Sequence, residues 1–406
     1  MKVYNASQIR NIAVVGHGGD GKTTLVEAML YNAGVTDRRG KVEDGNTVTD
    51  FDPEETKRHI SLTAAMAPVE WKNTKINFID APGFFDFVGE TTQAYYLADS
   101  ALILANAFSG VGVGAEKAYK FCKKAGKPMA VLINQVDKEH SDFNKVLDEL
   151  KEKMGQAITP MQIPIMDGMN FKGYVDVIEG KAYEFGAKPA DIKEVAVPAD
   201  LEDEIAEIRE AVIENAAAND EELMMMYLEG EELTKEQIIG GLHDGIADAS
   251  VIPVFVASAL QNLGVVSLMD ALLAYMPTAD KAPAVKAVDA SENEVEVVRS
   301  ADGAFAAQVL KTIADPFLGK INIFKVFRGE LKADTALYNV NKGKAEKFSN
   351  ISVMCGKKLI NIDKICAGDI GALAKLQFTS TGDTLAAASD KVQFPEVSFG
   401  EPCISL

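Results

Sequence analysis

Residues 11–32 read NIAVVGHGGDGKTTLVEAMLYN, and this stretch decides the fold. Its first five residues form an apolar run typical of a buried strand, and its last ten have the apolar spacing of a helix that Gly34 can end. The turn between them fits GxxxxGK[ST] in the strand–loop–helix context that the pattern requires. The residues that we expect to contact a ligand here are His17, Gly18, Gly19, Asp20, Gly21, Lys22, Thr23 and Thr24.

This turn has the chemistry of a phosphate site. Backbone N–H groups of such a loop hold phosphate oxygens, and the helix N-terminus adds positive potential. Lys22 is expected to reach the outer phosphates, and Thr23 to offer its hydroxyl to Mg²⁺. The alternative interpretation is a glycine-rich turn without a ligand.

Further apolar runs extend the pattern along the chain. They are INFI (76–79), ALILA (101–105), MAVLI (129–133) and VIPVFV (251–256), and helix-compatible sequence separates them. Continuous apolar strands that alternate with helices predict a parallel sheet covered on both faces. The fold class is therefore an α/β P-loop NTPase domain.

Polar residues follow the ends of these strands. Asp80 stands where a carboxylate holds Mg²⁺ directly or through water, and Gly83 would offer its N–H close to the γ-phosphate. Asp137 can accept two hydrogen bonds from guanine, whereas adenine would leave the carboxylate unpaired, so this residue selects the base. The other residues expected around the base are Asn134, Gln135, Ser258, Ala259 and Leu260. Taken alone, the segment 134–137 also fits a polar turn with a helix N-cap.

The remaining sequence predicts two more units. Residues of about 160–250 interrupt the α/β pattern with short strands and acidic helices, which predicts an inserted α+β subdomain within a domain of residues 1–280. Short alternating runs punctuated by glycine predict an all-β barrel domain over residues 286–390. Residues 391–406 begin an apolar pattern that stops, which predicts the start of a truncated third domain.

Composition narrows the class of protein. The chain has 406 residues and a net charge of −19, which argues against bulk attraction to nucleic acid. Charge is uneven: residues 161–250 hold 6 basic and 22 acidic residues, whereas residues 303–389 hold 12 basic and 7 acidic. The apolar runs are too short to span a bilayer, and the four cysteines show neither close pairing nor metal spacing. We expect a cytoplasmic protein with reduced thiols.

The ordered motifs, with Arg58-His59-Ile60-Ser61 before the strand 76–79, resemble those of the translational GTPases. The specific resemblance is to bacterial elongation factor G, and it includes the acidic segment 216–236 and two second-domain motifs, DPFLG (315–319) and TGDTL (381–385). It covers nearly the whole chain. The resemblance implies binding of GTP and GDP with Mg²⁺, ribosome-stimulated GTP hydrolysis, and promotion of tRNA and mRNA movement. It assigns Lys22, Gly83 and the residue at position 84 to catalysis and Thr23, Ser61 and Asp80 to the metal.

The chain departs from that family at the catalytic position. The family has a histidine that positions water after its Asp-Thr-Pro-Gly, and here the residue is Phe84. A phenyl ring cannot hydrogen-bond water, so we expect slow hydrolysis. His59 replaces a glycine and is expected to face solvent, with compensation for the lost histidine as the less favoured alternative.

Three further departures concern nucleotide binding. Ser61 replaces a threonine and keeps the hydroxyl, and Gln135 replaces a lysine and loses its charge. The phosphate loop has Gly19 where the family has aspartate, and Asp20 follows it. Because a triphosphate repels a carboxylate, we expect Asp20 to point to solvent or to a cation.

The resemblance also implies partners. These are the ribosome, through ribosomal RNA and ribosomal proteins including the stalk, with tRNA and mRNA contacted indirectly. The protein is expected to be a monomer that does not bind membranes. The segment Met224-Met225-Met226 is expected to be helix core and surface, with a stalk contact as the alternative. Two other functions stay open, a ribosome-protection or rescue factor and a GTP-sensing module without turnover.

Overall fold

The predicted strand runs all lie in one sheet of seven strands in the computed structural model, which describes residues 1–188 and 191–399. Neighbouring strands are parallel except for β2 and β3, which are antiparallel. The strands, in spatial order, are β2 (Ala65–Trp71), β3 (Thr74–Asp80), β1 (Ile9–Gly16), β4 (Ser100–Asn106), β5 (Met129–Asn134), β11 (Ile252–Ala257) and β6 (Ile158–Pro160). This confirms the predicted α/β domain.

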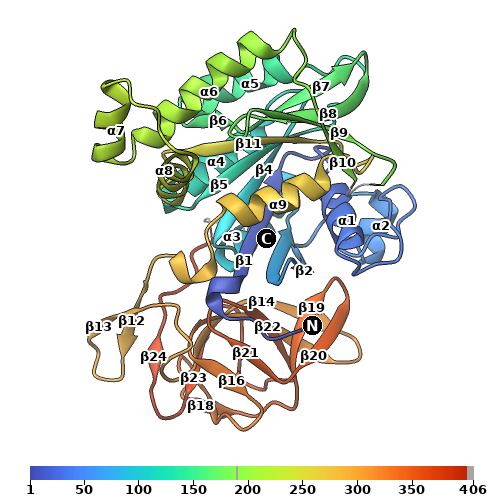
Figure 1. Ribbon diagram of the computed structural model, residues 1–406. Coiled ribbons are helices and arrows are strands. Elements are labelled where there is room, and N and C mark those ends of the chain that lie inside the picture. The colour runs from blue at the N-terminus through green and yellow to red at the C-terminus, as the bar shows by residue number, and fades with distance from the viewer. Residues whose placement is uncertain (189–190, 400–406) are drawn as a thin grey trace.

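Helices cover both faces of this sheet, as the apolar strands require (Figure 1). One buried cluster packs α3, α4 and α5 on the sheet, and a second packs α1 and α9 on the opposite face. The helices and short 3₁₀ turns of this domain are η1 (Ala6–Gln8), α1 (Lys22–Asn32), α2 (Pro53–Arg58), η2 (Phe85–Phe87), α3 (Val88–Leu97), α4 (Val113–Ala125), α5 (Phe143–Met154), α9 (Val265–Tyr275) and η3 (Ala279–Lys281). None of the helices within the described residues has the length and apolarity to cross a membrane.

The sequence patterns missed strand β2. It contains Pro68, which cannot donate to a ladder, but β2 is the edge strand of its sheet and tolerates the missing N–H. Its last residue, Trp71, donates its indole N–H to Asp270 of α9 at 2.8 Å. The edge strand is thus tied to the helix layer on one face.

The insertion has the predicted mixed α+β character. Its four strands form an antiparallel sheet, and its helices lie at the end of the molecule away from the second domain (Figure 1). The elements are β7 (Gln162–Asp167), β8 (Asn170–Asp176), β9 (Lys181–Phe185), β10 (Ile192–Val195), α6 (Glu202–Ala217), α7 (Glu221–Leu228) and α8 (Lys235–Ala247). Met225 on α7 is 63 % exposed, and Met224 and Met226 are partly buried.

The second domain is antiparallel and built on an eight-stranded sheet with a separate apolar core. The strands in spatial order are β18 (Lys344–Glu346), β17 (Leu337–Asn339), β23 (Thr384–Ala387), β14 (Ala306–Asp315), β15 (Gly319–Arg328), β22 (Ile370–Ala374), β19 (Ile351–Cys355) and β20 (Lys358–Ile362). Two smaller sheets join β13 (Glu294–Val297), β12 (Val285–Asp289) and β24 (Val392–Gln393), and β16 (Glu330–Lys332) with β21 (Lys364–Cys366). The predicted start of a third domain over 391–406 thus includes β24, which pairs with β12, and residues 400–406, which lie outside the described residues.

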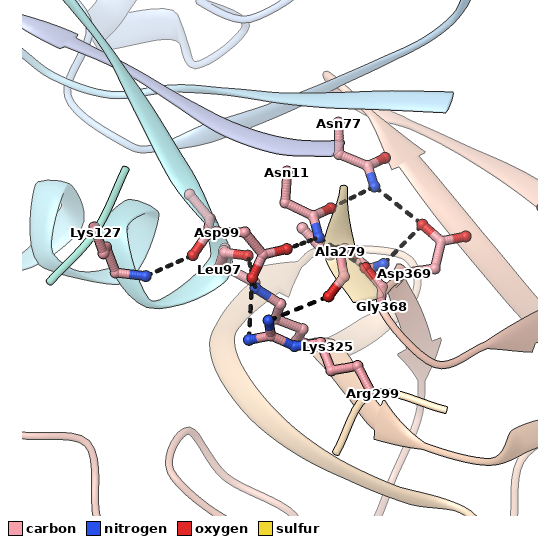
Figure 2. A network of polar contacts seen from close by, with 12 residues as sticks. Asn11, Asn77, Leu97, Asp99, Lys127, Ala279, Arg299, Lys325, Gly368 and Asp369 are labelled. Atoms are coloured by element: carbon pink, nitrogen blue, oxygen red, sulfur yellow. Dashed lines mark hydrogen bonds and ion pairs between the residues drawn. The ribbon is translucent and has the colours of Figure 1, made fainter. Parts of the chain in front are cut away.

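A buried ion network joins the two domains (Figure 2). Asp99, between α3 and β4, accepts from Lys325 of β15 at 2.6 Å, from Arg299 at 3.0 Å and from Asn11 at 2.6 Å. A second buried pair joins Lys75 of β3 to Asp369 at 2.8 Å. Polar groups without water must pair with each other, so these contacts fix one arrangement of the domains.

The charges around Asp99 are unbalanced. Burial alone would raise the pKa of Asp99, but the cations Lys325, Arg299 and Lys127 outweigh burial and lower it. Burial lowers the pKa of Lys325 to about 7, against the attraction of Asp99 and with the repulsion of Arg299 and Lys127. Two cations therefore pair with one carboxylate inside the interface, and a third, Lys127, acts on it from nearby.

Candidate functional site

The candidate site lies where β1, β3, β5 and β11 end. The carboxyl ends of parallel strands meet at one edge of a sheet, and the strand order reverses beside β1, where ligands of open α/β sheets bind. A cavity of about 320 Å³ opens at this edge. The predicted residues that line it are Gly18, Gly19, Gly21, Lys22, Thr23, Thr24, Ser61, Gly83, Phe84, Asn134, Gln135, Asp137, Ala259 and Leu260.

The phosphate loop needs its glycines. Gly19 and Gly21 have φ values of 89° and 88°, in the left-handed region that favours glycine. Gly21 is also the residue before α1, so the loop leads into the helix N-terminus. The Lys22 ammonium is buried and donates to the carbonyl oxygens of His17 at 2.7 Å and Gly16 at 3.3 Å, and burial lowers its pKa. A phosphate in the cavity would give this ammonium a charged acceptor.

Of the two directions expected for the Asp20 carboxylate, toward solvent or toward a cation, the structure excludes the first. The residue is 3 % exposed, and its Oδ2 accepts the backbone N–H of His17 at 2.7 Å. Burial raises the pKa of Asp20 to about 6, although Lys22 acts in the opposite direction. Asp20 therefore holds the phosphate loop through a backbone N–H and is not among the residues that line the cavity.

The His17 side chain also lies outside the cavity lining. It packs near Gly112 and the ring of Phe85, and the His17 backbone lies against Gly114. A contact of His17 with a ligand stays a prediction.

Hydroxyls and carboxylates converge behind Lys22. Asp80 Oδ2 accepts from the hydroxyls of Thr23 at 2.9 Å and Thr49 at 2.7 Å, and the Thr23 and Ser61 hydroxyls are 3.1 Å apart. Asp50 is a second buried carboxylate near Asp80; it is 5 % exposed and lines the cavity. The cluster brings the three predicted metal residues together.

This cluster fits a hard divalent cation. Burial raises the pKa of Asp50 to about 7, with repulsion from Asp80 next, and burial raises the pKa of Asp80 to about 6. One oxygen of each, Asp50 Oδ2 and Asp80 Oδ1, is buried without a hydrogen-bond partner among the described residues. Within that part of the chain, no group of three or more His, Cys, Asp or Glu side chains is placed to hold a metal. Two carboxylates and two hydroxyls suit Mg²⁺, which usually keeps waters and substrate phosphates as its other ligands.

Gly83 and Phe84 close the phosphate end of the cavity. A Cβ added to Gly83 would lie 2.4 Å from the Lys22 ammonium and 2.7 Å from the Gly18 nitrogen, so only glycine fits here. The Phe84 ring lies over Gly18, where an added Cβ would meet it at 2.9 Å. Phe84 remains 42 % exposed, so the ring covers the loop without being part of the core.

Asn134 joins the two ends of the cavity. Its amide donates to the Asp20 carbonyl at 2.8 Å, and its oxygen accepts the Ala259 N–H at 3.0 Å. Gln135 donates to the Gly19 carbonyl at 2.9 Å. Asp137 lines the cavity, half-buried, beside Ala259 and Leu260. Ser258 is buried and outside the lining, and its hydroxyl accepts the Gln261 N–H at 3.2 Å.

The sequence patterns missed several residues here. Thr49 and Asp50 lie in a segment without apolar periodicity, so nothing local marks them. Glu27 on α1 holds this segment through the N–H groups of Gly40 at 2.8 Å and Val48 at 2.6 Å. A signal did exist for α2, since Asp52-Pro53-Glu54-Glu55 forms a capping box. His59 ends α2, is exposed as expected, and lines the cavity.

Comparisons with known proteins show the family of the chain. The model of the elongation factor Tu GTP binding domain matches residues 7–278, and the model of elongation factor G domain 2 matches residues 304–388. A solved structure of a protein from Thermus thermophilus is similar, with 32% identity and a TM-score of 0.85, over 97% of this chain and 56% of that protein. The chain thus spans little more than half the length of this relative. The matches to both domains show that the chain belongs to the elongation factor Tu and elongation factor G family of translational GTPases.

Proposed function

We propose that this chain binds GTP and GDP with Mg²⁺ and hydrolyses GTP on the ribosome, as an elongation factor of the G type that promotes tRNA and mRNA movement in the cytoplasm. The observation that carries the proposal is one cavity lined by the phosphate loop, Ser61, Gly83 and Asp137. The segments that supply these residues are far apart in the sequence. Their convergence fits one ligand with a phosphate end and a base end.

The residues have distinct roles in this proposal. The Lys22 ammonium and the loop N–H groups hold the β- and γ-phosphates. Thr23, Ser61 and Asp80 hold Mg²⁺, which neutralises charge on the phosphates. Gly83 presents its N–H to the γ-phosphate.

Base selection rests on Asp137. Its carboxylate accepts from the N1–H and the exocyclic amine of guanine, and adenine has an acceptor at N1. A hydrogen bond to a charged group is worth about 1.5–3 kcal/mol, and leaving the carboxylate unpaired costs a similar amount. Calorimetry with GTP, GDP and ATP in the presence of Mg²⁺ tests this. Equal affinity for guanosine and adenosine nucleotides would exclude the proposal.

Phe84 makes turnover slow in this proposal. The ring covers Gly18 and has no group that orients water. Phosphate release in a single turnover with ribosomes, compared between the parent and Phe84→His, measures the effect. We expect the variant to be faster, and equal rates would show that Phe84 is not limiting.

The presence of Phe84, which has no group that orients water, also favours a second candidate function. This is a GTP-sensing ribosome-binding module without turnover. Phosphate release separates the two, since the sensor binds GTP and releases none. The partners are proposed on the family resemblance and on charge, with the basic second domain facing ribosomal RNA and the protein acting as a monomer. A translocation assay tests the elongation role.

A further inference from the structure

One carboxylate links the nucleotide segments to the second domain. Glu90 stands in the first turn of α3, seven residues after Gly83. Its Oε2 accepts the backbone N–H of Ala64 at 2.8 Å, three residues after Ser61. The same oxygen accepts from the Lys311 ammonium of β14. Glu90 therefore touches the segment after Ser61, belongs to the segment after Gly83, and is held from the second domain.

Carboxylate side chains accept the backbone N–H groups of the chain between Ser61 and β2. The N–H groups of Leu62 and Thr63 both donate to Glu55 Oε1, at 2.9 and 3.0 Å, and the next N–H, of Ala64, donates to Glu90. Glu55 is fully buried and belongs to α2, which lies just before Ser61 in the chain. Of these two acceptors, Glu90 is therefore the one that comes from a different part of the chain.

Lys311 is built to reach this carboxylate. The pairing of β14 with β15 shifts register between Val309 and Lys311, which leaves Leu310 as an extra residue. Such a bulge re-aims the side chains beside it. The Lys311 side chain is only 5 % exposed, and Glu90 is its ion-pair partner. Because a buried ammonium needs a counter-charge, Lys311 holds Glu90 in one place.

The second domain touches the same region once more. The Gly356 N–H, in the turn between β19 and β20, donates to the Met66 carbonyl of β2 at 2.8 Å. A Cβ on Gly356 would lie 2.1 Å from the Val48 carbonyl, so this turn packs directly on the segment that carries Thr49 and Asp50. The segments that meet a γ-phosphate therefore rest on the second domain at two points.

We infer that Glu90 and Lys311 are positioning residues that make the affinity for GTP, relative to that for GDP, depend on the second domain. This inference rests on the proposed function. Ser61 and Gly83 meet the end of the nucleotide that only GTP has, and Glu90 fixes the chain that follows each of them. When the Lys311 ammonium is removed, Glu90 loses its ion-pair partner and no longer holds the Ala64 N–H in place. Binding of GTP then has to order the chain between Ser61 and β2. The base, the ribose and the first two phosphates do not need this segment, so GDP binding is spared.

The test compares two buried lysines on adjacent strands. Lys311→Met removes the cation that supports Glu90, and Lys325→Met removes a buried cation that binds Asp99 and the Leu97 carbonyl at the opposite end of α3 from Glu90. Calorimetry measures GTP and GDP affinity in Mg²⁺ for the whole chain, and thermal unfolding checks that each variant is folded. We expect Lys311→Met to weaken GTP binding about five- to tenfold, as coupling between sites commonly does, with GDP affinity changed by less than about twofold. Lys311→Arg should restore the parental ratio, and Lys325→Met should keep it.

Two results overturn the inference. One is a folded Lys311→Met protein with the parental ratio of GTP to GDP affinity. The other is an equal loss in Lys325→Met, which would mean that any loosening of the interface has the effect. Failure of the proposed function would be visible earlier, because the parent itself would then bind neither nucleotide.

Discussion

Replacing Asp99 by asparagine should destabilise the protein in a way that depends on pH. The substitution keeps the shape and removes the carboxylate that Lys325 and Arg299 share. The side chains of these two cations are 1 % and 7 % exposed. Removing one partner of a buried ion pair costs about 3–5 kcal/mol, because the other charge stays without compensation.

The pH dependence follows from the pKa of Lys325, which the fold lowers to about 7 from the ordinary 10.5. Below pH 7 the parent holds Lys325 charged and paired, and the variant must either bury that charge or neutralise it. Above pH 7 Lys325 is largely neutral in both proteins, so its share of the loss disappears and only that of Arg299 remains. We expect a loss of about 3–5 kcal/mol at pH 6 that shrinks at pH 8.5 by at most about 1.4 kcal/mol.

Urea unfolding followed by circular dichroism at both pH values measures this loss. Glu194→Gln is the control, since its pair with Lys181 is exposed and should contribute less than about 1 kcal/mol. A folded Asp99→Asn protein with the parental midpoint at both pH values would refute the reasoning. It would mean that the interface opens at no cost, or that water reaches the cations.

Three shorter predictions concern the site. Asp20→Asn should raise the free energy of unfolding by about 3 kcal/mol at pH 7.5 and by less than about 1 kcal/mol near pH 4. Because burial raises the pKa of Asp20 to about 6, the parent loses stability as pH rises from 3.8 through 6. Asparagine avoids this loss and still accepts the His17 N–H. Urea unfolding at both pH values checks this. Affinity for nucleotide with Mg²⁺ should fall as pH drops from 7.5 to 6, because protons then bind Asp50 and Asp80, whose pKa values are about 7 and about 6. Calorimetry at both pH values measures this affinity, and an affinity that does not fall contradicts the cation site. Asn134→Ala removes two hydrogen bonds and should lower the free energy of unfolding by about 1–3 kcal/mol, and an unchanged urea midpoint would count against its bridging role.

The site was predictable where its signals are local. The phosphate loop, Asp80 and Asp137 each follow an apolar run, and parallel strands bring such ends together without further information. The expectation of a solvent-facing Asp20 was wrong because the N–H of His17, three residues away, is a hydrogen-bond donor that holds the carboxylate in the protein. The pairing of Lys311 with Glu90 spans 221 residues, and no pattern within either segment announces it.

Some elements of the fold could not be predicted either, because their local sequence opposes the structure that they adopt. Strand β2 contains a proline that is tolerated only because the strand is at an edge, and edge position is a property of the whole sheet. Helix α8 contains Gly241, which weakens the helical pattern. A Cβ there would lie 2.3 Å from the Ala216 carbonyl of α6, so the glycine permits the close crossing of two helices. Both residues oppose local propensity for a reason found only in tertiary contacts.

The bond between Trp71 and Asp270 provides a native optical probe. Trp71 is the only tryptophan of the chain, so its emission needs no engineered label and has no background from other indoles. It ends the strand that begins beside Ala64, and its indole N–H is fixed to a charged acceptor on a helix that covers the sheet. A shift of that strand would alter the distance to the acceptor and with it the colour and intensity of the emission. Rapid mixing with nucleotide can therefore follow the edge of the sheet in real time in the unmodified protein.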